Sequence, residues 1–119
     1  MTRTLEERNA NLAAARALIA AGWCRGSYAE DEAGQALGSE QINDETARAS
    51  PPVCYCARGA LVRVLNLPDD RNSGHTPESA AISTVARRYW RDSEITVNDE
   101  AQSVAEVLTL FDLAMQEPL

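Results

Sequence analysis

Residues 54–65 read Cys-Tyr-Cys-Ala-Arg-Gly-Ala-Leu-Val-Arg-Val-Leu and form the most continuously apolar segment of the chain. If the segment is helical, only Arg58 and Arg63 interrupt its apolar surface, and a helix that is hydrophobic nearly all round is buried. Two prolines precede the segment and Pro68 follows it, and these bound the helix because proline disrupts helical structure. We therefore predict a central buried helix over about 54–66, against which the other elements pack.

The bulk composition is that of an ordinary globular protein. The chain has 119 residues, of which 45% are hydrophobic and 24% charged, and this size predicts a single domain over residues 1–119. No stretch approaches the roughly 18 apolar residues of a membrane span. The N-terminal residues lack the apolar core of a signal peptide. We therefore expect a cytoplasmic protein that makes no contact with membranes.

The charge of the chain bears on its partners. The net charge is −7, and all 11 basic residues are arginine. An acidic chain is repelled by phosphate backbones, which disfavours direct binding to nucleic acid. Its surface can meet a basic protein, or it can serve only to keep the protein in solution.

Three amphipathic helices surround the central one in this prediction. Thr4 and Glu7 form a capping box before a helix over about 5–21, and Gly22 is suited to a left-handed position at its end. Thr76 before Pro77 marks the start of a helix over about 77–91, with Tyr89 on its buried side. A second capping box begins at Ser103 and precedes a helix over about 104–116.

The remaining segments predict little regular structure. Asp31-Glu32-Ala33-Gly34 has the turn chemistry of a hairpin, with the return strand at 35–37. Residues 95–97 are Ile-Thr-Val and are expected to be extended. Gly59 in the central helix costs roughly 1 kcal/mol relative to Ala, which indicates a close approach by a neighbouring backbone or ring. The predicted fold class is mainly α (α+β), a small helical domain around a central buried helix with one short β-hairpin.

Several short motifs occur in a familiar order. They are Trp23-Cys24-Arg25-Gly26, Cys56-Ala57-Arg58-Gly59-Ala60-Leu61, Asn98-Asp99, and Ala105-Glu106-Val107-Leu108 with Phe111 and Ala114 downstream. On these motifs the chain resembles a family of small uncharacterised bacterial and phage proteins classed as a domain of unknown function. The resemblance extends from about Leu12 to Met115 and brings no known activity.

Cys56 is the candidate nucleophile, because it lies near a helix start, where the thiolate is favoured. Nucleophilic catalysis also needs a base within hydrogen-bond reach, and nothing in the sequence places the only histidine, His75, beside Cys56. The alternative is a packed core thiol. Cys24, Cys54, Cys56 and His75 could together supply the four ligands of a zinc site. However, the Cys-x-Cys pair at the start of a helix points its two thiols to different faces. We therefore expect neither a metal nor a cofactor.

Two polar motifs are candidate binding residues. Asn98-Asp99 could bind a cation or a substrate, although such a pair more often caps a turn. Glu30, Asp31 and Glu32 lie at the predicted hairpin tip, where they form either a solvated turn or an acidic contact for a basic partner.

The function is best interpreted as protein binding. A small acidic chain with no recognisable catalytic set suits a protein-binding module of bacterial or phage origin, and inhibition of a host defence protein is one such role. The alternative is a small thiol-dependent enzyme that uses Cys56, with Asn98 and Asp99 as further site residues. The sequence identifies neither the partner nor the oligomeric state.

Overall fold

The computed structural model describes residues 3–119 as five helices and a small sheet. The helices are α1 (Leu5–Ala21), α2 (Ala57–Val64), α3 (Pro77–Val85), α4 (Glu94–Glu100) and α5 (Val104–Ala114). The strands are β1 (Ala29–Asp31), β2 (Ala36–Leu37) and β3 (Pro52–Tyr55), in the antiparallel order β2-β1-β3. The predicted mainly α (α+β) class and the predicted hairpin, β1 with β2, are both confirmed.

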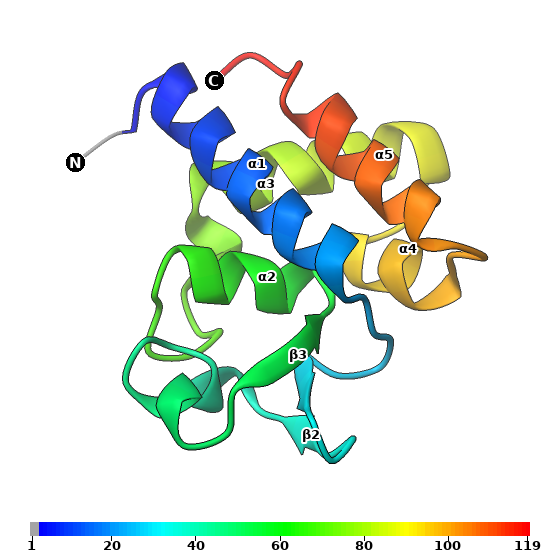
Figure 1. Ribbon diagram of the computed structural model, residues 1–119. Helices are drawn as coiled ribbons and strands as arrows, with labels where there is room; N and C mark the ends of the chain where they lie inside the picture. The colour runs from blue at the N-terminus through cyan, green and yellow to red at the C-terminus, as the bar shows by residue number, and fades with distance from the viewer. Residues whose placement is uncertain (1–2) are drawn as a thin grey trace.

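The helices pack around α1 and α2. In Figure 1, α1 crosses the centre of the molecule with α5 beside it and α3 behind it, α2 lies below α1, and the sheet lies beyond α2. One cluster of buried apolar side chains joins these elements. Its fully buried members of largest volume are Leu12, Ile19, Ile42, Leu61, Val62, Ile82, Val85, Val107, Leu110 and Phe111. Within the described residues, no helix has the length and the apolar content to cross a membrane.

The central helix is shorter than predicted. It begins at Ala57 rather than at Cys54, because the residues before it form strand β3. The backbone of Tyr55 pairs with β1 on one side and donates to Gly22 O at 2.9 Å on the other. A short apolar run has no periodicity that separates a strand from a buried helix. The predicted burial is confirmed, because most of the remaining stretch is buried in the core.

Two glycines are required by close backbone contacts. A Cβ on Gly59 would lie 1.8 Å from Tyr28 O, so the predicted close approach at Gly59 is confirmed. The predicted left-handed conformation of Gly22 is wrong, since its φ of −170° is extended. Gly22 is needed because a Cβ there would lie 2.2 Å from Val53 O, where β3 runs alongside it.

Residues 95–97 are helical rather than extended. They lie in α4, whose start is capped by Ser93: its Oγ accepts a hydrogen bond from Thr96 N at 3.2 Å. The three β-branched residues favour a strand by propensity. Tertiary packing overrides this preference, because Val97 and the following Asn98 are buried against the rest of the domain.

The predicted helix over 77–91 changes type at its end. It is α-helical to Val85 and then continues as a π-helical turn over Ala86–Trp90. The wider turn moves later side chains round the axis relative to the α-helical spacing. Tyr89 therefore leaves the buried side and is 57% exposed, contrary to the prediction.

The predicted helix starts differ in how they are capped. At Thr4 the capping box is confirmed, with Glu7 N donating to Thr4 Oγ1 at 3.1 Å and Thr4 N donating to Glu7 Oε1 at 2.9 Å. At Thr76 the cap is also confirmed. Helix α5 begins at Val104 as predicted, but the capping box at Ser103 is wrong, because the Ser103 side chain makes no capping hydrogen bond.

Candidate functional site

Asn98 is a buried amide that fastens three segments together. Its Oδ1 accepts hydrogen bonds from Trp23 Nε1 and from Ala57 N, both at 3.0 Å. Its Nδ2 donates to Cys24 O at 3.2 Å and to Asp99 Oδ1 at 3.1 Å. Since the amide satisfies the backbone at the start of α2 and in the segment after α1, Asn98 has a structural role and is not accessible to a ligand.

Asp99, the other half of the predicted pair, faces the surface. Its Oδ1 accepts from Gly26 N at 3.0 Å, and no ion pair joins Asp99 to any of residues 3–119. The carboxylate lies in the wall of a hollow of about 200 Å³. We call it the α4 hollow; it is lined by Gly26, Ser27, Tyr28, Ile95 and Asp99.

The α4 hollow combines an apolar wall with an unused polar group. Ile95 is 49% exposed and supplies the apolar wall. The hydroxyl oxygen of Ser27 is buried and has no hydrogen-bond partner. A buried hydroxyl without a partner is costly, and a water, an ion or a ligand can supply the missing bond.

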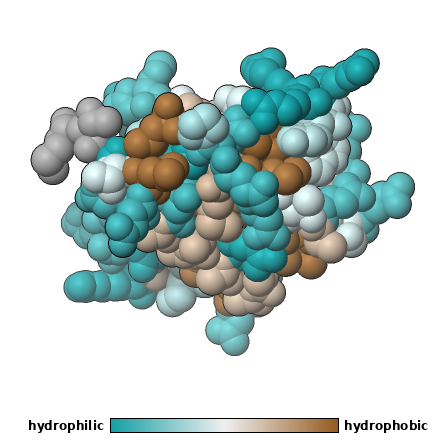
Figure 2. All heavy atoms as spheres, turned by 90° about the horizontal axis from the view of Figure 1, so that it is seen from above, coloured by the Kyte–Doolittle hydropathy of each residue, from teal (hydrophilic) through white to brown (hydrophobic). Residues whose placement is uncertain are grey.

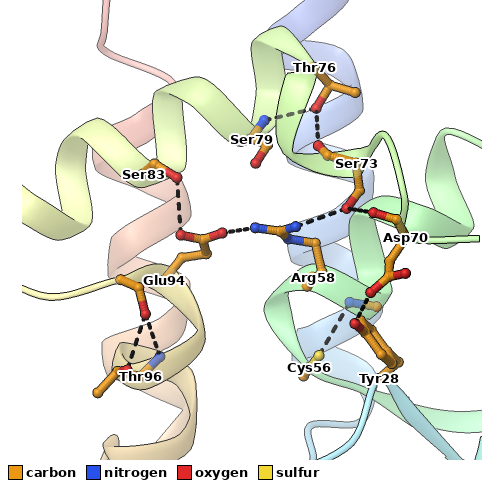
Figure 3. A network of polar contacts seen from close by, with 12 residues as sticks. Tyr28, Cys56, Arg58, Asp70, Ser73, Thr76, Ser79, Ser83, Glu94 and Thr96 are labelled. Atoms are coloured by element: carbon orange, nitrogen blue, oxygen red, sulfur yellow. Dashed lines mark hydrogen bonds and ion pairs between the residues drawn. The ribbon is translucent and has the colours of Figure 1, made fainter. Parts of the chain in front are cut away.

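Tyr28 connects the hollow to a network of polar side chains. The Tyr28 hydroxyl donates to the Asp70 carboxylate, and this hydrogen bond, together with burial, raises the pKa of Tyr28 to about 12. Figure 3 shows this hydrogen bond together with the rest of the network, in which Arg58 lies between Ser73 and Glu94. The Tyr28 hydroxyl is therefore protonated at neutral pH and held by Asp70, and Tyr28 is one of the residues that line the hollow.

The ion pair of Arg58 and Glu94 joins α2 to α4. Arg58 donates to Ser73 Oγ at 2.9 Å as well as to Glu94, and Ser83 Oγ donates to Glu94 at 3.0 Å. Burial raises the pKa of Glu94, but the hydrogen bond and the charge of Arg58 with the other donors outweigh it and leave the pKa below its ordinary value. Sequence reasoning missed this pair. An arginine in a nearly apolar helix was the available signal, because buried arginine is almost always paired.

The environment of Cys56 opposes a nucleophilic role. Cys56 is the N-cap of α2, and its Sγ accepts a hydrogen bond from Gly59 N at 3.2 Å. Burial raises the pKa of the thiol above its ordinary value, although the amides of Gly59 and Arg58 act in the opposite direction. The thiol is therefore protonated at neutral pH. His75 is exposed in the turn Ser73–His75 and makes no hydrogen bond with Cys56 in the part of the chain that the structure describes.

The other two cysteines are also reduced thiols. Cys24 is buried and Cys54 is half-buried in β3. Burial raises the pKa of Cys24, and the neighbouring Cys54 thiol raises it further. From residue 3 to residue 119, no three His, Cys, Asp or Glu side chains are grouped so that they could hold a metal ion.

A family model matches residues 4–117, which is nearly the whole chain. The chain belongs to the DUF6197 family, a family of unknown function. No curated protein and no solved structure matches it. Membership of DUF6197 agrees with the predicted resemblance to a family of unknown function, and it carries no activity to this chain.

In this DUF6197 chain, one of the three carboxylates at the acidic hairpin tip makes hydrogen bonds within the hairpin. Asp31 Oδ1 accepts from Ala33 N at 3.0 Å and from Gln35 N at 2.9 Å, so Asp31 closes the turn between β1 and β2. Glu30 and Glu32 form no ion pair within residues 3–119, and Glu32 is exposed. The predicted tip position is confirmed for Asp31 and Glu32, whereas Glu30 lies within β1, paired with Ala36 and Cys54. The binding role of the three carboxylates stays a prediction.

A second acidic hollow lies on the other side of α4 in the DUF6197 fold. It measures about 120 Å³ and is lined by Trp90, Asp92, Thr96, Val97, Glu100, Ala101 and Glu106. Three of these residues are acidic and none is basic. The helix α4, which sequence reasoning missed, thus carries carboxylates into two separate hollows.

The face in Figure 2 differs from a broad apolar docking surface. The view is from above Figure 1, and brown hydrophobic spheres form separate patches among teal hydrophilic ones. Large exposed apolar patches mark sites of interaction with proteins or membranes, ligand-binding grooves or aggregation-prone surface. On this face, the DUF6197 chain instead presents a surface on which hydrophilic and hydrophobic residues are mixed.

Proposed function

We propose that this chain is a small acidic protein-binding module that recognises a basic partner. The observation that carries the proposal is the distribution of ion pairs. Six arginines pair with six carboxylates elsewhere in the described chain. Within residues 3–119, the carboxylates of the hairpin tip and of the two hollows beside α4 form no ion pair. These surfaces supply part of the unbalanced negative charge that a basic protein would meet.

The specific form of the proposal is a cytoplasmic protein of bacterial or phage origin that inhibits a host defence protein. Its size and its charge of −7 support this form, because charge complementarity accelerates association and selects among partners. A thiol enzyme using Cys56 has less support, since the raised pKa of that thiol removes the thiolate that such chemistry needs.

The test begins with capture of a partner from host lysate and continues with association rates at two salt concentrations. We expect the association rate constant to fall steeply as salt screens the attraction. A triple variant, Glu30→Gln, Asp31→Asn and Glu32→Gln, should associate more slowly. Its thermal stability should be nearly unchanged, because Asp31→Asn keeps the Oδ1 acceptor that closes the turn.

Glu45→Gln is the matched control. Glu45 is exposed and forms no ion pair within residues 3–119, so this variant removes a carboxylate away from the proposed surfaces. The control should associate at the wild-type rate. Binding that is independent of salt and survives the triple replacement would exclude the hairpin tip as a binding surface.

A further inference from the structure

We infer that the α4 hollow binds one long basic side chain of the partner, with the cation against Asp99 and the aliphatic stem against Ile95. This inference rests on the proposed function, because it specifies how a basic partner would be anchored. It assigns separate roles to two surfaces. The hairpin tip attracts the partner over a distance, and the hollow holds one of its residues.

The size of the hollow selects a side chain over a small-molecule cofactor. Sites for drug-sized ligands and cofactors typically measure about 300–1,000 Å³. The α4 hollow measures about 200 Å³ and is open to the surface. A nucleotide or a flavin would not be enclosed in such a space, whereas a single amino-acid side chain would be.

The lining of the hollow selects a positive charge. Its one charged member is Asp99, and no arginine contributes to the lining. Asp99 Oδ1 already accepts from Gly26 N and from Asn98 Nδ2, whereas Oδ2 forms no hydrogen bond in the described chain. These two hydrogen bonds hold the carboxylate in place, so its remaining oxygen is fixed in advance for a cation.

The other lining residues suit the rest of a basic side chain. Lysine and arginine lay their methylene stems along apolar surface and keep the charged end in a polar environment. Exposed Ile95 and the ring of Tyr28 offer that apolar surface. Ser27 also lines the hollow, and its hydroxyl, which has no hydrogen-bond partner within residues 3–119, is a further candidate acceptor for the cation.

An ammonium group fits this site better than a guanidinium group. Arginine binds carboxylate most strongly through two parallel hydrogen bonds to two oxygens. Here Asp99 Oδ1 is occupied by two protein donors, and only Oδ2 is available. A compact ammonium needs single acceptors, which Oδ2 and Ser27 Oγ supply, so we expect lysine to be preferred.

The test uses n-butylammonium chloride as a probe and follows binding by NMR chemical-shift titration. We expect saturable shifts of the Gly26 and Ser27 amides and of the Ile95 methyl groups. n-Butylguanidinium should bind more weakly, and n-butanol, which has the same stem without the charge, should bind weakest. Equal binding of butanol, or shifts located elsewhere on the protein, would overturn the inference.

Three variants of the lining sharpen this test. Asp99→Asn keeps the Oδ1 acceptor and should weaken butylammonium binding roughly fivefold, as the loss of one strong exposed charge pair would. Ser27→Ala should weaken binding without lowering the melting temperature, because it removes a hydroxyl that bonds to nothing in the protein. Ile95→Ala should weaken both butylammonium and butanol. Wild-type affinity in Asp99→Asn would contradict the assigned role of the carboxylate.

The outcome separates this inference from the proposed function. The triple hairpin variant should bind butylammonium with wild-type affinity, because its substitutions lie outside the hollow. If butylammonium binds the hollow but no basic partner is captured, the proposed function fails and the site stands. If a partner binds with the same rate and affinity to Asp99→Asn and to wild type, the inference fails and the proposed function stands.

Discussion

Replacing Asn98 by Ala should strongly destabilise the fold. The substitution leaves two buried backbone groups without partners, Ala57 N–H and Cys24 C=O. Each buried unsatisfied group costs roughly 1–3 kcal/mol, so we expect a loss of about 2–6 kcal/mol in the free energy of unfolding. Trp23 Nε1 also loses its acceptor but is only partly buried, so water can replace that bond.

The measurement is urea-induced unfolding followed by far-UV circular dichroism, with the midpoint and the slope determined separately. The matched control is Asn72→Ala, since Asn72 is exposed and its side chain makes no hydrogen bond in the described chain. A change within about 0.5 kcal/mol in the free energy of unfolding is expected for such a surface site.

Asn98→Asp keeps an acceptor oxygen but places a second carboxylate beside Asp99. This variant should regain stability as the pH falls and the new carboxyl becomes protonated. A cost below about 1 kcal/mol for Asn98→Ala would refute the structural role that we assign to this amide.

Three further predictions concern the helices and their contacts. Gly59→Ala would raise stability by roughly 1 kcal/mol in an isolated helix. In this fold it should instead lower the melting temperature sharply, because the new Cβ would lie 1.8 Å from Tyr28 O. A stabilised variant would show that this contact does not exist. Thr76→Ala should cost about 0.5–2 kcal/mol, as loss of a cap does, whereas Ser103→Ala should cost almost nothing in the same urea titration, because Ser103 makes no capping bond. The pKa of Glu94 lies below the ordinary value of 4.5. Its contribution to the free energy of unfolding is therefore complete above pH 4.5 and is lost as the pH falls through its lower folded pKa. Glu94→Gln should reduce the dependence of stability on pH below 4.5, and an unchanged acid-unfolding profile would contradict this.

The parts of the fold that could be predicted are those encoded by local signals. The capping box at Thr4, the Thr-Pro start of α3 and the turn closed by Asp31 each depend on residues within four positions of one another. Such local patterns are readable in a single sequence because the interacting groups are specified together.

The errors occurred where distant contacts decide the local structure. Strand β3 exists because Tyr55 finds backbone partners in β1 and at Gly22, which the sequence does not bring together. Helix α4 exists because Glu94 pairs with Arg58 and because Val97 is buried. In both segments, short runs of apolar or β-branched residues suit two structures, and the tertiary partner selects one of them.

The candidate site was predictable only in fragments. Asn98 and Asp99 were identified as one polar motif, but α4 separates their roles, since Asn98 is buried and Asp99 reaches the surface. Ser27 and Ile95 gave no signal, because a serine in a loop and an isoleucine in a predicted strand are unremarkable. The α4 hollow forms only when α4 packs beside the segment that follows α1, and nothing in the local sequence of either specifies that contact.

The parallel bridge between Trp23 and Tyr55 has a consequence for solubility. A strand at the edge of a sheet presents unpaired N–H and C=O groups on which strands of other molecules can add, and this is a common origin of aggregation. On the β3 side of the sheet, the segment from Gly22 to Cys24 occupies that position, with Tyr55 N bonded to Gly22 O and Cys24 N bonded to Tyr55 O. On the opposite side, β2 has only two residues, too few for another strand to pair with securely. Loosening the segment after α1 would therefore expose β3 as an edge on which strands of other molecules could add, and we expect such a change to promote self-association.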